Sequence, residues 1–477
     1  MYRKEYTETI FRTGSHTSRK SSVKQHEMAA LREMEQMILA AEAVPAGAEA
    51  LERATAHLEQ FLQQVRQKRI LDEKQRAMEA FRQQFENGYT WRNGFLRNVA
   101  RFGDREALIE PESGTVWTYT QLNAEANRLS HALLRAGLQK GDVVMVQLHN
   151  CPEFVFAYLA CHKTGMVFCP VNFRLSAKEI TDCMDNSRPK VFLLEPETQA
   201  EVDMALRRTA HAPQILLTTD ARAAHAYAGF TADCPATEPE LPWELSVYDE
   251  TLRLFTSGTT GRQKSVCLTS INEVLSAHDV MIHFPFSFTD RSMNTTPWFH
   301  RGGLHSGGIT PTLYAGGTVI IQRKFQPEKT LDMVQQYGLT FLIGVPNVLE
   351  LLAEAQQKQP RDLSSLRGIV TMGSPLERAD CIRYQKILTK RIFNGYGTTE
   401  TFWNTFLRPD DLPEMAGSAG RSCVDDDVRV VKVYEDRVAE PDDLAATDGS
   451  EVGEVIIRSN AKSAAFYFGN PAETRRR

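Results

Sequence analysis

Apolar residues recur at intervals of three and four along residues 48–87, a stretch that contains no glycine or proline. This spacing places them on one side of a helix, so the pattern predicts a long amphipathic α-helix. Its apolar side is formed by Leu51, Ala54, Leu58, Phe61 and Val65. After the polar stretch 69–73, a second apolar seam is formed by Met78, Phe81 and Phe85.

The same spacing occurs upstream and predicts a second helix that ends before Pro45. Its apolar positions are Leu31, Met34, Ile38 and Ala41. Residues 45–47 can form a turn, so the two helices are expected to make a hairpin. Residues 1–24 are polar and are expected to be mobile. We interpret residues 1–87 as a helical extension, which either packs on the main body or mediates homodimerisation or partner docking.

After residue 88, short apolar strands alternate with amphipathic helices. Residues 117–120 predict a strand followed by a helix with apolar positions at Leu122, Ala126, Leu129, Ala132 and Leu133. Residues 142–148 and 165–170 predict buried strands, with a helix over 154–163 between them. Helices that separate short apolar strands favour parallel, doubly wound sheets, so residues 88–477 are predicted to have an α/β fold.

The composition narrows the possible functions. The chain has 477 residues, 42% of them hydrophobic and 24% charged, which is enough for a large core and more than one domain. A formal net charge of −5 argues against nucleic acid as a partner. No apolar run is long enough to span a membrane, and the polar first 24 residues lack the apolar core of a signal peptide.

The cysteines predict a reducing compartment. Eight of them are scattered in apolar surroundings with no Cys-x-x-Cys pair, at Cys151, Cys161, Cys169, Cys183, Cys234, Cys267, Cys381 and Cys423. This pattern is typical of buried, reduced thiols in a cytoplasmic protein, and no zinc site is expected. Cys267, near the lysine discussed next, is expected to be packed and inert.

Residues 256–264 carry the strongest chemical signal: Thr256-Ser257-Gly258-Thr259-Thr260-Gly261-Arg262-Gln263-Lys264. The apolar residues 252–255 before them predict a strand, so the run would form a loop at a strand end. Glycines let the backbone approach an anion, while hydroxyls and an ammonium group donate to phosphate oxygens. The spacing differs from a Walker A loop. The alternative is an ordinary Ser/Thr/Gly turn.

This run resembles the phosphate-binding signature of the adenylate-forming superfamily, which includes acyl-CoA synthetases, luciferases and peptide-synthetase adenylation domains. Gln263 stands where the family usually has proline, which should loosen the loop without removing a phosphate contact.

A downstream segment also resembles the family: Asn394-Gly395-Tyr396-Gly397-Thr398-Thr399-Glu400. In the family, this segment stacks its tyrosine on adenine, offers a threonine hydroxyl to the α-phosphate and holds Mg²⁺ through the glutamate. An aromatic face suits a purine, and a lone carboxylate with substrate phosphates commonly holds Mg²⁺. The alternative is a glycine-rich turn that caps a helix beginning near Thr399.

Further segments follow in the family's order. Residues 371–376, which include Gly373, Ser374 and Pro375, resemble the segment that lines the adenine side of the pocket. Residues 297–303 resemble the segment in which acyl-CoA synthetases place a histidine, here His300, beside the acyl pocket and the thiol channel. Later matches are residues 417–421, 453–458 and 466–474. The resemblance therefore extends from about residue 89 to residue 474.

The resemblance implies two doubly wound α/β subdomains, a smaller β-rich subdomain and a nucleotide between them. It implies an ATP-dependent carboxylic acid:CoA ligase that forms an acyl-AMP and pyrophosphate before the thioester, with ATP, Mg²⁺ and coenzyme A as cofactors and fatty acids among the acids such enzymes activate. The implied catalytic residues are Lys264, Thr399, Glu400 and His300, with Glu400 as the metal ligand. The nucleotide would contact residues 256–261, Lys264, 373–375 and 394–399.

The family continues with a Gly-Asp motif, a hinge and a small C-terminal domain that carries a second lysine, whereas this sequence ends at Arg477. Without that lysine, binding is expected to persist and chemistry to slow. A truncated enzyme, a fragment completed in trans and a degenerate family member all fit this pattern.

Two alternative functions stay open. An adenylation domain that loads an amino acid usually has an aspartate where this chain has Trp298-Phe299-His300, so an aryl or other acid loaded onto a carrier protein fits better. The other alternative is a noncatalytic module that binds a nucleotide or acyl-AMP. Trp403, just beyond Glu400, would either narrow the acyl pocket or pack in the core.

Overall fold

The computed structural model describes residues 47–256, 263–460, 462–464 and 466–476. The chain divides into two compact units, Met1–Gln83 and Gln84–Arg477. The upstream helix predicted before Pro45, and the hairpin that it would form, lie outside the described residues.

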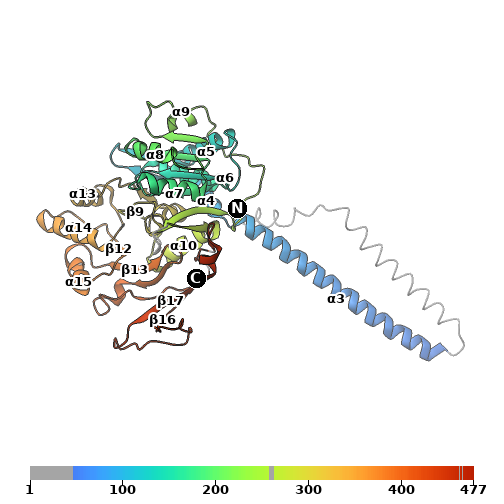
Figure 1. The fold of residues 1–477 in the computed structure, drawn as a ribbon. Helices are drawn as coiled ribbons and strands as arrows, with labels where there is room; N and C mark the ends of the chain where they lie inside the picture. The colour runs from blue at the N-terminus through green and yellow to red at the C-terminus, as the bar shows by residue number, and fades with distance from the viewer. Residues whose placement is uncertain (1–46, 257–262, 461, 465, 477) are drawn as a thin grey trace. The chain divides into compact units, whose positions relative to one another are not determined.

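In the first unit, α3 (Gly47–Gly88) is the long blue helix of Figure 1 and continues into the second unit. Its 42 residues form one uninterrupted helix, which confirms the prediction for residues 48–87. Met78 and Phe81 of the second apolar seam are 58% and 63% exposed, so the described residues leave these two side chains largely uncovered. No described helix is both long enough and apolar enough to cross a bilayer.

A seven-stranded sheet has the order β18-β8-β7-β4-β3-β5-β6. Its strands are β3 (Val143–Gln147), β4 (Val167–Pro170), β5 (Val191–Leu194), β6 (Ile215–Thr218), β7 (Glu250–Thr256), β8 (Lys264–Thr269) and β18 (Phe466–Tyr467). The strands from β7 to β6 in this order are parallel, while β8 pairs antiparallel with both β7 and β18. The strands predicted over 142–148 and 165–170 are thus confirmed.

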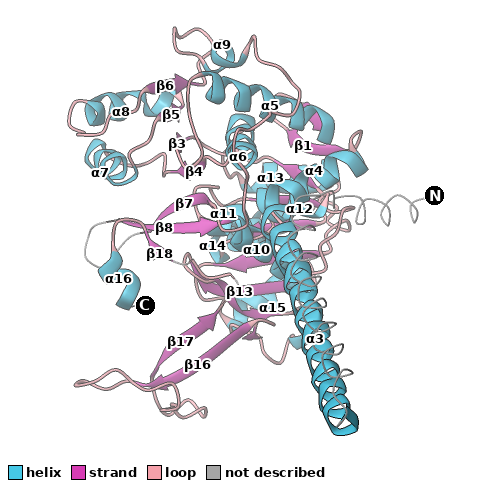
Figure 2. Ribbon diagram, turned by 90° about the vertical axis from the view of Figure 1, so that its right-hand side faces the viewer, coloured by secondary structure: helices cyan, strands magenta, loops and turns pink. Residues whose placement is uncertain are grey.

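Helices cover both faces of this sheet. They are α5 (Tyr119–Arg135), α6 (Pro152–Thr164), α7 (Ala177–Ser187), α8 (Gln199–Leu206) and α9 (Tyr227–Thr231), with the 3₁₀ turn η1 (Pro196–Thr198) before α8. Figure 2 shows α7 and α8 on one side of the strands and α5 and α6 on the other, which is the predicted doubly wound arrangement. Thr118 ends the strand predicted over 117–120 because its side chain caps α5, with Gln121 completing a capping box.

A nine-stranded sheet has the order β15-β14-β13-β12-β11-β9-β10-β1-β2. Its strands are β1 (Glu106–Glu110), β2 (Thr115–Thr118), β9 (Arg291–Asn294), β10 (Thr318–Ile320), β11 (Phe341–Gly344), β12 (Gly368–Met372), β13 (Ile392–Thr398), β14 (Phe402–Leu407) and β15 (Arg421–Ser422). The six strands from β13 to β1 in this order are parallel.

Two layers of helices flank the nine-stranded sheet. Figure 1 shows α13, α14 and α15 together on one side, away from α10. These helices are α4 (Trp91–Phe102), α10 (Ser270–His283), α11 (Arg301–His305), α12 (Ile309–Ala315), α13 (Pro327–Tyr337), α14 (Pro346–Lys358) and α15 (Arg378–Ile387).

A smaller β-rich part completes the unit, as predicted. It contains the antiparallel pair β16 (Asp426–Lys432) and β17 (Gly453–Ser459), preceded by the 3₁₀ turn η2 (Pro409–Asp411). After this pair the chain returns to the seven-stranded sheet as β18 and ends in α16 (Pro471–Arg476). The last described segment of the chain therefore lies against β8, the strand that begins at Lys264.

Candidate active site

Two of the predicted phosphate-binding residues lie at the loop end of the β7–β8 hairpin. Thr256 ends β7 and Lys264 begins β8, and the two residues are direct partners in the antiparallel register. The strand predicted over 252–255 is confirmed as part of β7. Ser257, Gly258, Thr259, Thr260 and Gly261 lie outside the described residues. The hairpin therefore fixes both ends of the predicted loop next to each other.

The predicted adenine-side segments lie at the ends of two neighbouring parallel strands. Met372 pairs with Gly395, so residues 373–375, just after β12, lie beside Tyr396 and Gly397 of β13. Gly373, Ser374 and Pro375 are exposed, and Gly373 has a φ of +83°, which favours glycine. Tyr396 is 40% exposed. The register thus brings together side chains from segments that are separate in the sequence.

A tight hairpin replaces the helix considered for Thr399. β13 ends at Thr398, residues 399–401 turn, and β14 begins at Phe402. Asn394 and Gly395 are buried in this sheet, while Gly397 and Thr398 are exposed. A Cβ on Gly397 would lie 1.5 Å from the carbonyl oxygen of Phe402, so the close approach of the two strands requires glycine there. The alternative of a capped helix is therefore wrong.

Glu400 sits in this turn and is held from the C-terminal segment. The hydroxyl of Tyr467 donates to Glu400 Oε1, and the amide of Ala464 donates to the Glu400 carbonyl oxygen over 2.7 Å. The guanidinium of Arg301 donates to the carbonyl oxygen of Thr399 over 2.5 Å. Hydrogen bonds from the C-terminal segment and from Arg301 thus hold the turn that carries Thr399 and Glu400, the predicted α-phosphate and Mg²⁺ ligands.

Tyr467 also connects Glu400 to the predicted phosphate lysine. Its strand, β18, pairs with β8, and its ring centroid lies 5.7 Å from Lys264 Nζ. The structure therefore brings Lys264, Thr399 and Glu400 to one place, although they come from different sheets.

Lys264 has a carboxylate partner that the sequence analysis missed. Its ammonium lies 2.5 Å from Glu473 Oε1 of α16, and the two side chains are only 11% and 15% exposed. These residues are 209 positions apart, so no local pattern predicts their contact. The only signal in the sequence is that Glu473 falls within the family-like segment 466–474.

His300 is placed at the start of α11, directly before Arg301. More than a third of its surface is exposed, but its ring packs on Phe299 with centroids 4.1 Å apart. The neighbouring protein displaces water from the ring and lowers the pKa of His300 below 6.5, because desolvation disfavours the imidazolium. Its role beside an acyl or thiol pocket stays a prediction.

Trp403 belongs to the core. It is 3% exposed and its ring lies 4.6 Å from Phe406 and 5.7 Å from Phe284. This packing supports the core interpretation of Trp403 over a position in an acyl pocket. Trp403 itself lies in the strand β14, Phe402–Leu407, so no helix directly follows it.

The eight cysteines, which all lie among the described residues, are buried and carry free thiols, as predicted. Burial raises the pKa of the Cys267 thiol far above its usual value, since water no longer solvates the thiolate. Cys267 is therefore a packed, unreactive thiol.

One group of described side chains has a spacing suited to a metal: Asp279, His283 and Cys423, whose ligand atoms lie within 4.8 Å of one another. The ammonium of Lys462 already lies 2.9 Å from Asp279 and from Asp426. His283 Nδ1 contacts the Arg408 guanidinium at 2.6 Å, so this nitrogen accepts and Nε2 carries the proton toward Asp279. The ammonium of Lys462 therefore already balances the negative charge of these carboxylates, and the cluster is poorly suited to binding a metal cation.

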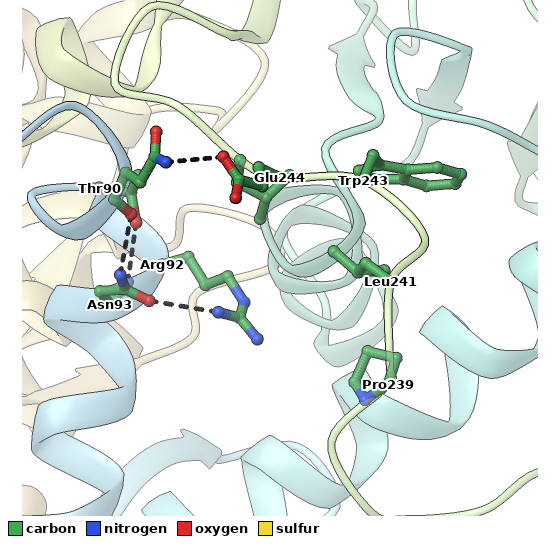
Figure 3. A pocket seen from close by; sticks show the side chains of 9 residues that line it. Thr90, Arg92, Asn93, Pro239, Leu241, Trp243 and Glu244 are labelled. Atoms are coloured by element: carbon green, nitrogen blue, oxygen red, sulfur yellow. Dashed lines mark hydrogen bonds between the residues drawn. The ribbon is translucent and has the colours of Figure 1, made fainter. Parts of the chain in front are cut away.

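A cavity of about 300 Å³ lies elsewhere in the second unit, beside the end of α3 (Figure 3). Its lining residues are Asn87, Thr90, Arg92, Asn93, Pro239, Leu241, Trp243, Glu244 and Leu245. Two of these residues are hydrogen-bonded to each other: the side-chain amide of Asn87 donates to Glu244 over 2.8 Å. None of the predicted site residues lines this cavity.

Comparison with known proteins identifies the family to which this geometry corresponds. The family model described as AMP-binding enzyme matches residues 95–467. An indoleacetate–CoA ligase of Aromatoleum aromaticum is 30% identical over 373 residues, which cover 76% of this chain and 70% of that protein. A feruloyl-CoA synthase of an Amycolatopsis species is 30% identical over 78% of this chain and 71% of its own length.

A solved structure has the same fold. The anthranilate CoA ligase AuaEII, in complex with anthranoyl-AMP, superimposes with a TM-score of 0.72 over 81% of this chain and 72% of its own, at 20% identity. The predicted α/β architecture is confirmed by this match.

Proposed function

The chain belongs to the AMP-binding enzyme family, and we propose that it is an ATP-dependent acid–thiol ligase that joins a carboxylic acid to coenzyme A. In the first step, a carboxylate oxygen of the acid attacks the α-phosphorus of ATP, and the bond to pyrophosphate breaks to give an acyl-AMP. In the second, the thiol sulfur attacks the acyl carbon, the thiol proton is lost, and AMP leaves with the electron pair of the broken C–O bond.

The described residues have the right chemistry for a magnesium nucleotide. The Glu400 carboxylate lies in a partly exposed turn and accepts a hydrogen bond from the Tyr467 hydroxyl, and Lys264 Nζ lies 5.7 Å from the centroid of the same tyrosine ring. A carboxylate combined with phosphate oxygens and water is a common Mg²⁺ site. Bound Mg²⁺ would neutralise charge on the phosphates, and Glu400 would be the protein ligand that holds it.

We assign the remaining roles by the position of each residue. Lys264 and residues 256–261 would hold the β- and γ-phosphates, and the Thr399 hydroxyl would contact the α-phosphate. The ring of Tyr396 would stack on adenine, with residues 373–375 and 394–398 around it. His300 would border the acid and thiol pocket. Ordered donors of this kind stabilise charge that develops on a transferring phosphoryl group.

A single observation supports this proposal most strongly. The supporting contacts are those of Tyr467, whose strand β18 pairs with β8: its ring lies 5.7 Å from Lys264 Nζ and its hydroxyl donates to Glu400, so the proposed phosphate lysine and the carboxylate both contact one side chain. Two residues that serve one triphosphate need such convergence.

The proposal is tested by acid-dependent exchange of labelled pyrophosphate into ATP. Lys264→Ala is expected to lower the exchange rate by about 100-fold, because removing one charge-stabilising donor costs about that much. Lys190→Ala is the matched control, since Lys190 pairs with Asp142 on the surface before β5. Loss of exchange in both variants, or in neither, would contradict the assignment. Nucleotide binding without exchange would favour the noncatalytic binding module.

The acid and the acceptor are identified by a second assay. A panel of aryl acids and fatty acids, offered with coenzyme A or with a phosphopantetheinyl carrier protein, is expected to give a thioester with coenzyme A. Product on the carrier protein alone would identify the chain as a carrier-loading adenylation enzyme. We further propose a cytoplasmic location, which the eight buried free thiols support.

A further inference from the structure

Arg301 is a buried cation at the edge of the proposed site. It follows His300 as the first residue of α11 and is 3% exposed. Buried arginines are rare unless their guanidinium is paired, so each contact of this group calls for an explanation.

The guanidinium contacts three separate segments. Nη1 donates to the Thr399 carbonyl oxygen over 2.5 Å, in the β13–β14 turn. Nη2 donates to the Lys462 carbonyl oxygen over 2.8 Å, between β17 and β18, and to Ser276 Oγ of α10 over 3.2 Å. A planar fork with several donors can join three acceptors in this way, whereas a lysine ammonium is a compact point charge on a flexible stem.

Two of these contacts hold the chain segments that lie next to Glu400. Thr399 immediately precedes it, and the segment after Lys462 supplies the Ala464 amide and the Tyr467 hydroxyl that contact Glu400. Arg301 therefore fixes the two chain segments that together define where the Glu400 carboxylate lies.

Arg301 is also positively charged near neutral pH and attracts the Glu400 carboxylate. Burial lowers its pKa, while Glu273, Glu400 and Asp279 raise it, and the resulting pKa of about 10 keeps the group cationic near neutral pH. Its Nε has no partner among the described residues, so burying this guanidinium costs free energy that its other contacts must offset.

We propose that Arg301 is a positioning residue that holds the Glu400 carboxylate in the geometry for Mg²⁺ bound to ATP. This inference rests on the proposed function. It assigns to Arg301 no contact with substrate, only control of the residue that makes one.

The test compares ATP affinity by calorimetry with saturating Mg²⁺ and with EDTA, in the full chain. The ratio of the two affinities reports the Mg²⁺-dependent part of binding. Arg301→Met is expected to lower this ratio by about tenfold, because removing a residue that orients a metal ligand weakens metal affinity by about 10- to 100-fold. Arg301→Lys, which keeps the charge, should restore part of the ratio and carries the test if the methionine variant does not fold.

Arg361→Met is the matched control. Arg361 is also mostly buried, at 9% exposed, and donates to the Gln359 carbonyl oxygen and to Asp332, away from the site. Its loss should leave the ratio unchanged.

An equal loss of ATP affinity in both conditions would show that Arg301 is only structural and would overturn the inference. If the ratio falls in Glu400→Gln but not in Arg301→Met, the positioning role of Arg301 is wrong, while the proposed function and the metal role of Glu400 stand. A wild-type ratio of one would also remove the proposed metal role of Glu400, and no ATP binding in either condition would overturn the proposed function itself.

Discussion

At the scale of single residues, the proposed phosphate lysine already has an anionic partner. Lys264 pairs with Glu473, a carboxylate in the place where the proposed function puts a phosphate. A bound triphosphate must therefore displace Glu473 or accept a negative charge nearby. Either event costs binding free energy. We therefore expect the Glu473 carboxylate to make ATP bind more weakly than it would to the same site without that charge.

Glu473→Gln should therefore bind ATP more tightly, by about fivefold, equivalent to about 1 kcal/mol for a single ion pair of limited exposure. Isothermal titration measures this directly. Glu350→Gln, which breaks the ion pair with Arg383 on α15, serves as the control and should leave the affinity as it is. Weaker binding in Glu473→Gln would show that the carboxylate assists the nucleotide.

A second residue, Glu273, links stability to pH. It is fully buried, with His305 Nε2 2.6 Å away and His162 Nε2 3.7 Å away. Burial raises its pKa, but the two histidines lower it further, and the net pKa lies well below 4.5. The unfolded chain therefore binds more protons in acid, so this contribution to stability is present above about pH 4.5 and is lost as the pH falls below it.

Glu273→Gln should be less stable than wild type by about 3 kcal/mol at pH 7, the usual cost of breaking a buried ion pair. Urea unfolding at intervals from pH 7 to pH 3 should show this difference shrinking in the acid range. A difference that stays constant across the range would mean that Glu273 is not held ionised by the two histidines.

Among the elements, the β13–β14 hairpin positions Tyr396, Thr399 and Glu400, the proposed adenine, α-phosphate and Mg²⁺ contacts. Its strands approach so closely at Gly397 that no side chain fits, and Phe402 on the other strand has a φ of +64°, an unusual value for a bulky residue. The turn between them carries Thr399 and Glu400. Its shape therefore determines where these two groups lie.

Gly397→Ala should destabilise the protein by about 2 kcal/mol, a typical cost of forcing an extra methyl group into a packed site, and should also weaken ATP binding. Thermal unfolding and nucleotide titration measure the two effects. Gly229→Ala, where an added Cβ meets nothing within 4 Å, is the control: it should leave ATP affinity unchanged and should not lower stability, because Gly229 lies in helix α9, where alanine is favoured over glycine. Unchanged ATP affinity in Gly397→Ala would separate the hairpin from the site.

Elements set by local patterns could be predicted from the sequence, whereas the contacts between distant segments could not. The strands over 142–148 and 165–170 and the helix between them are marked by apolar runs and matching periodicity. The pairing of β18 with β8 joins positions about 200 residues apart, for which no local pattern exists. Tyr467, Glu473 and Arg301 were therefore missed as partners of the site.

At residues 399–401, a local sequence signal predicts the wrong element. A glycine-rich run with a threonine before a glutamate is typical of a helix start, yet the chain forms a second strand. Phe402 and Trp403, which follow Thr401, are aromatic and favour a strand, and they pack in one core cluster with Phe284 and Phe393. Tertiary packing thus outweighs the local capping signal.

At the scale of the whole molecule, the family match begins at residue 95, so α3 lies before it. Leu71, Met78 and Phe81 are exposed on α3, and their spacing of seven and three is that of a coiled-coil seam. A second copy of the same helix would supply a matching seam. Homodimerisation through α3 stays a prediction.

Sedimentation equilibrium tests this prediction. The full chain should have the mass of a dimer, and Met78→Glu combined with Phe81→Glu should have the mass of a monomer, because charges in an apolar seam oppose pairing. Gln75→Glu, an exposed polar position of α3, should leave the dimer intact. A wild-type chain with the mass of a monomer would show that the prediction of homodimerisation through α3 is wrong.

In the proposed function, Lys264 and Glu400 hold one magnesium nucleotide between the two sheets. Titration of ATP with Mg²⁺ into the wild-type chain, Lys264→Ala and Glu400→Gln measures it most directly. We predict saturable binding of one ATP per chain and a loss of affinity of about tenfold or more in each variant, since each removes a charged contact to the phosphates or their metal. Equal affinities in all three proteins would show that Lys264 and Glu400 do not hold the nucleotide.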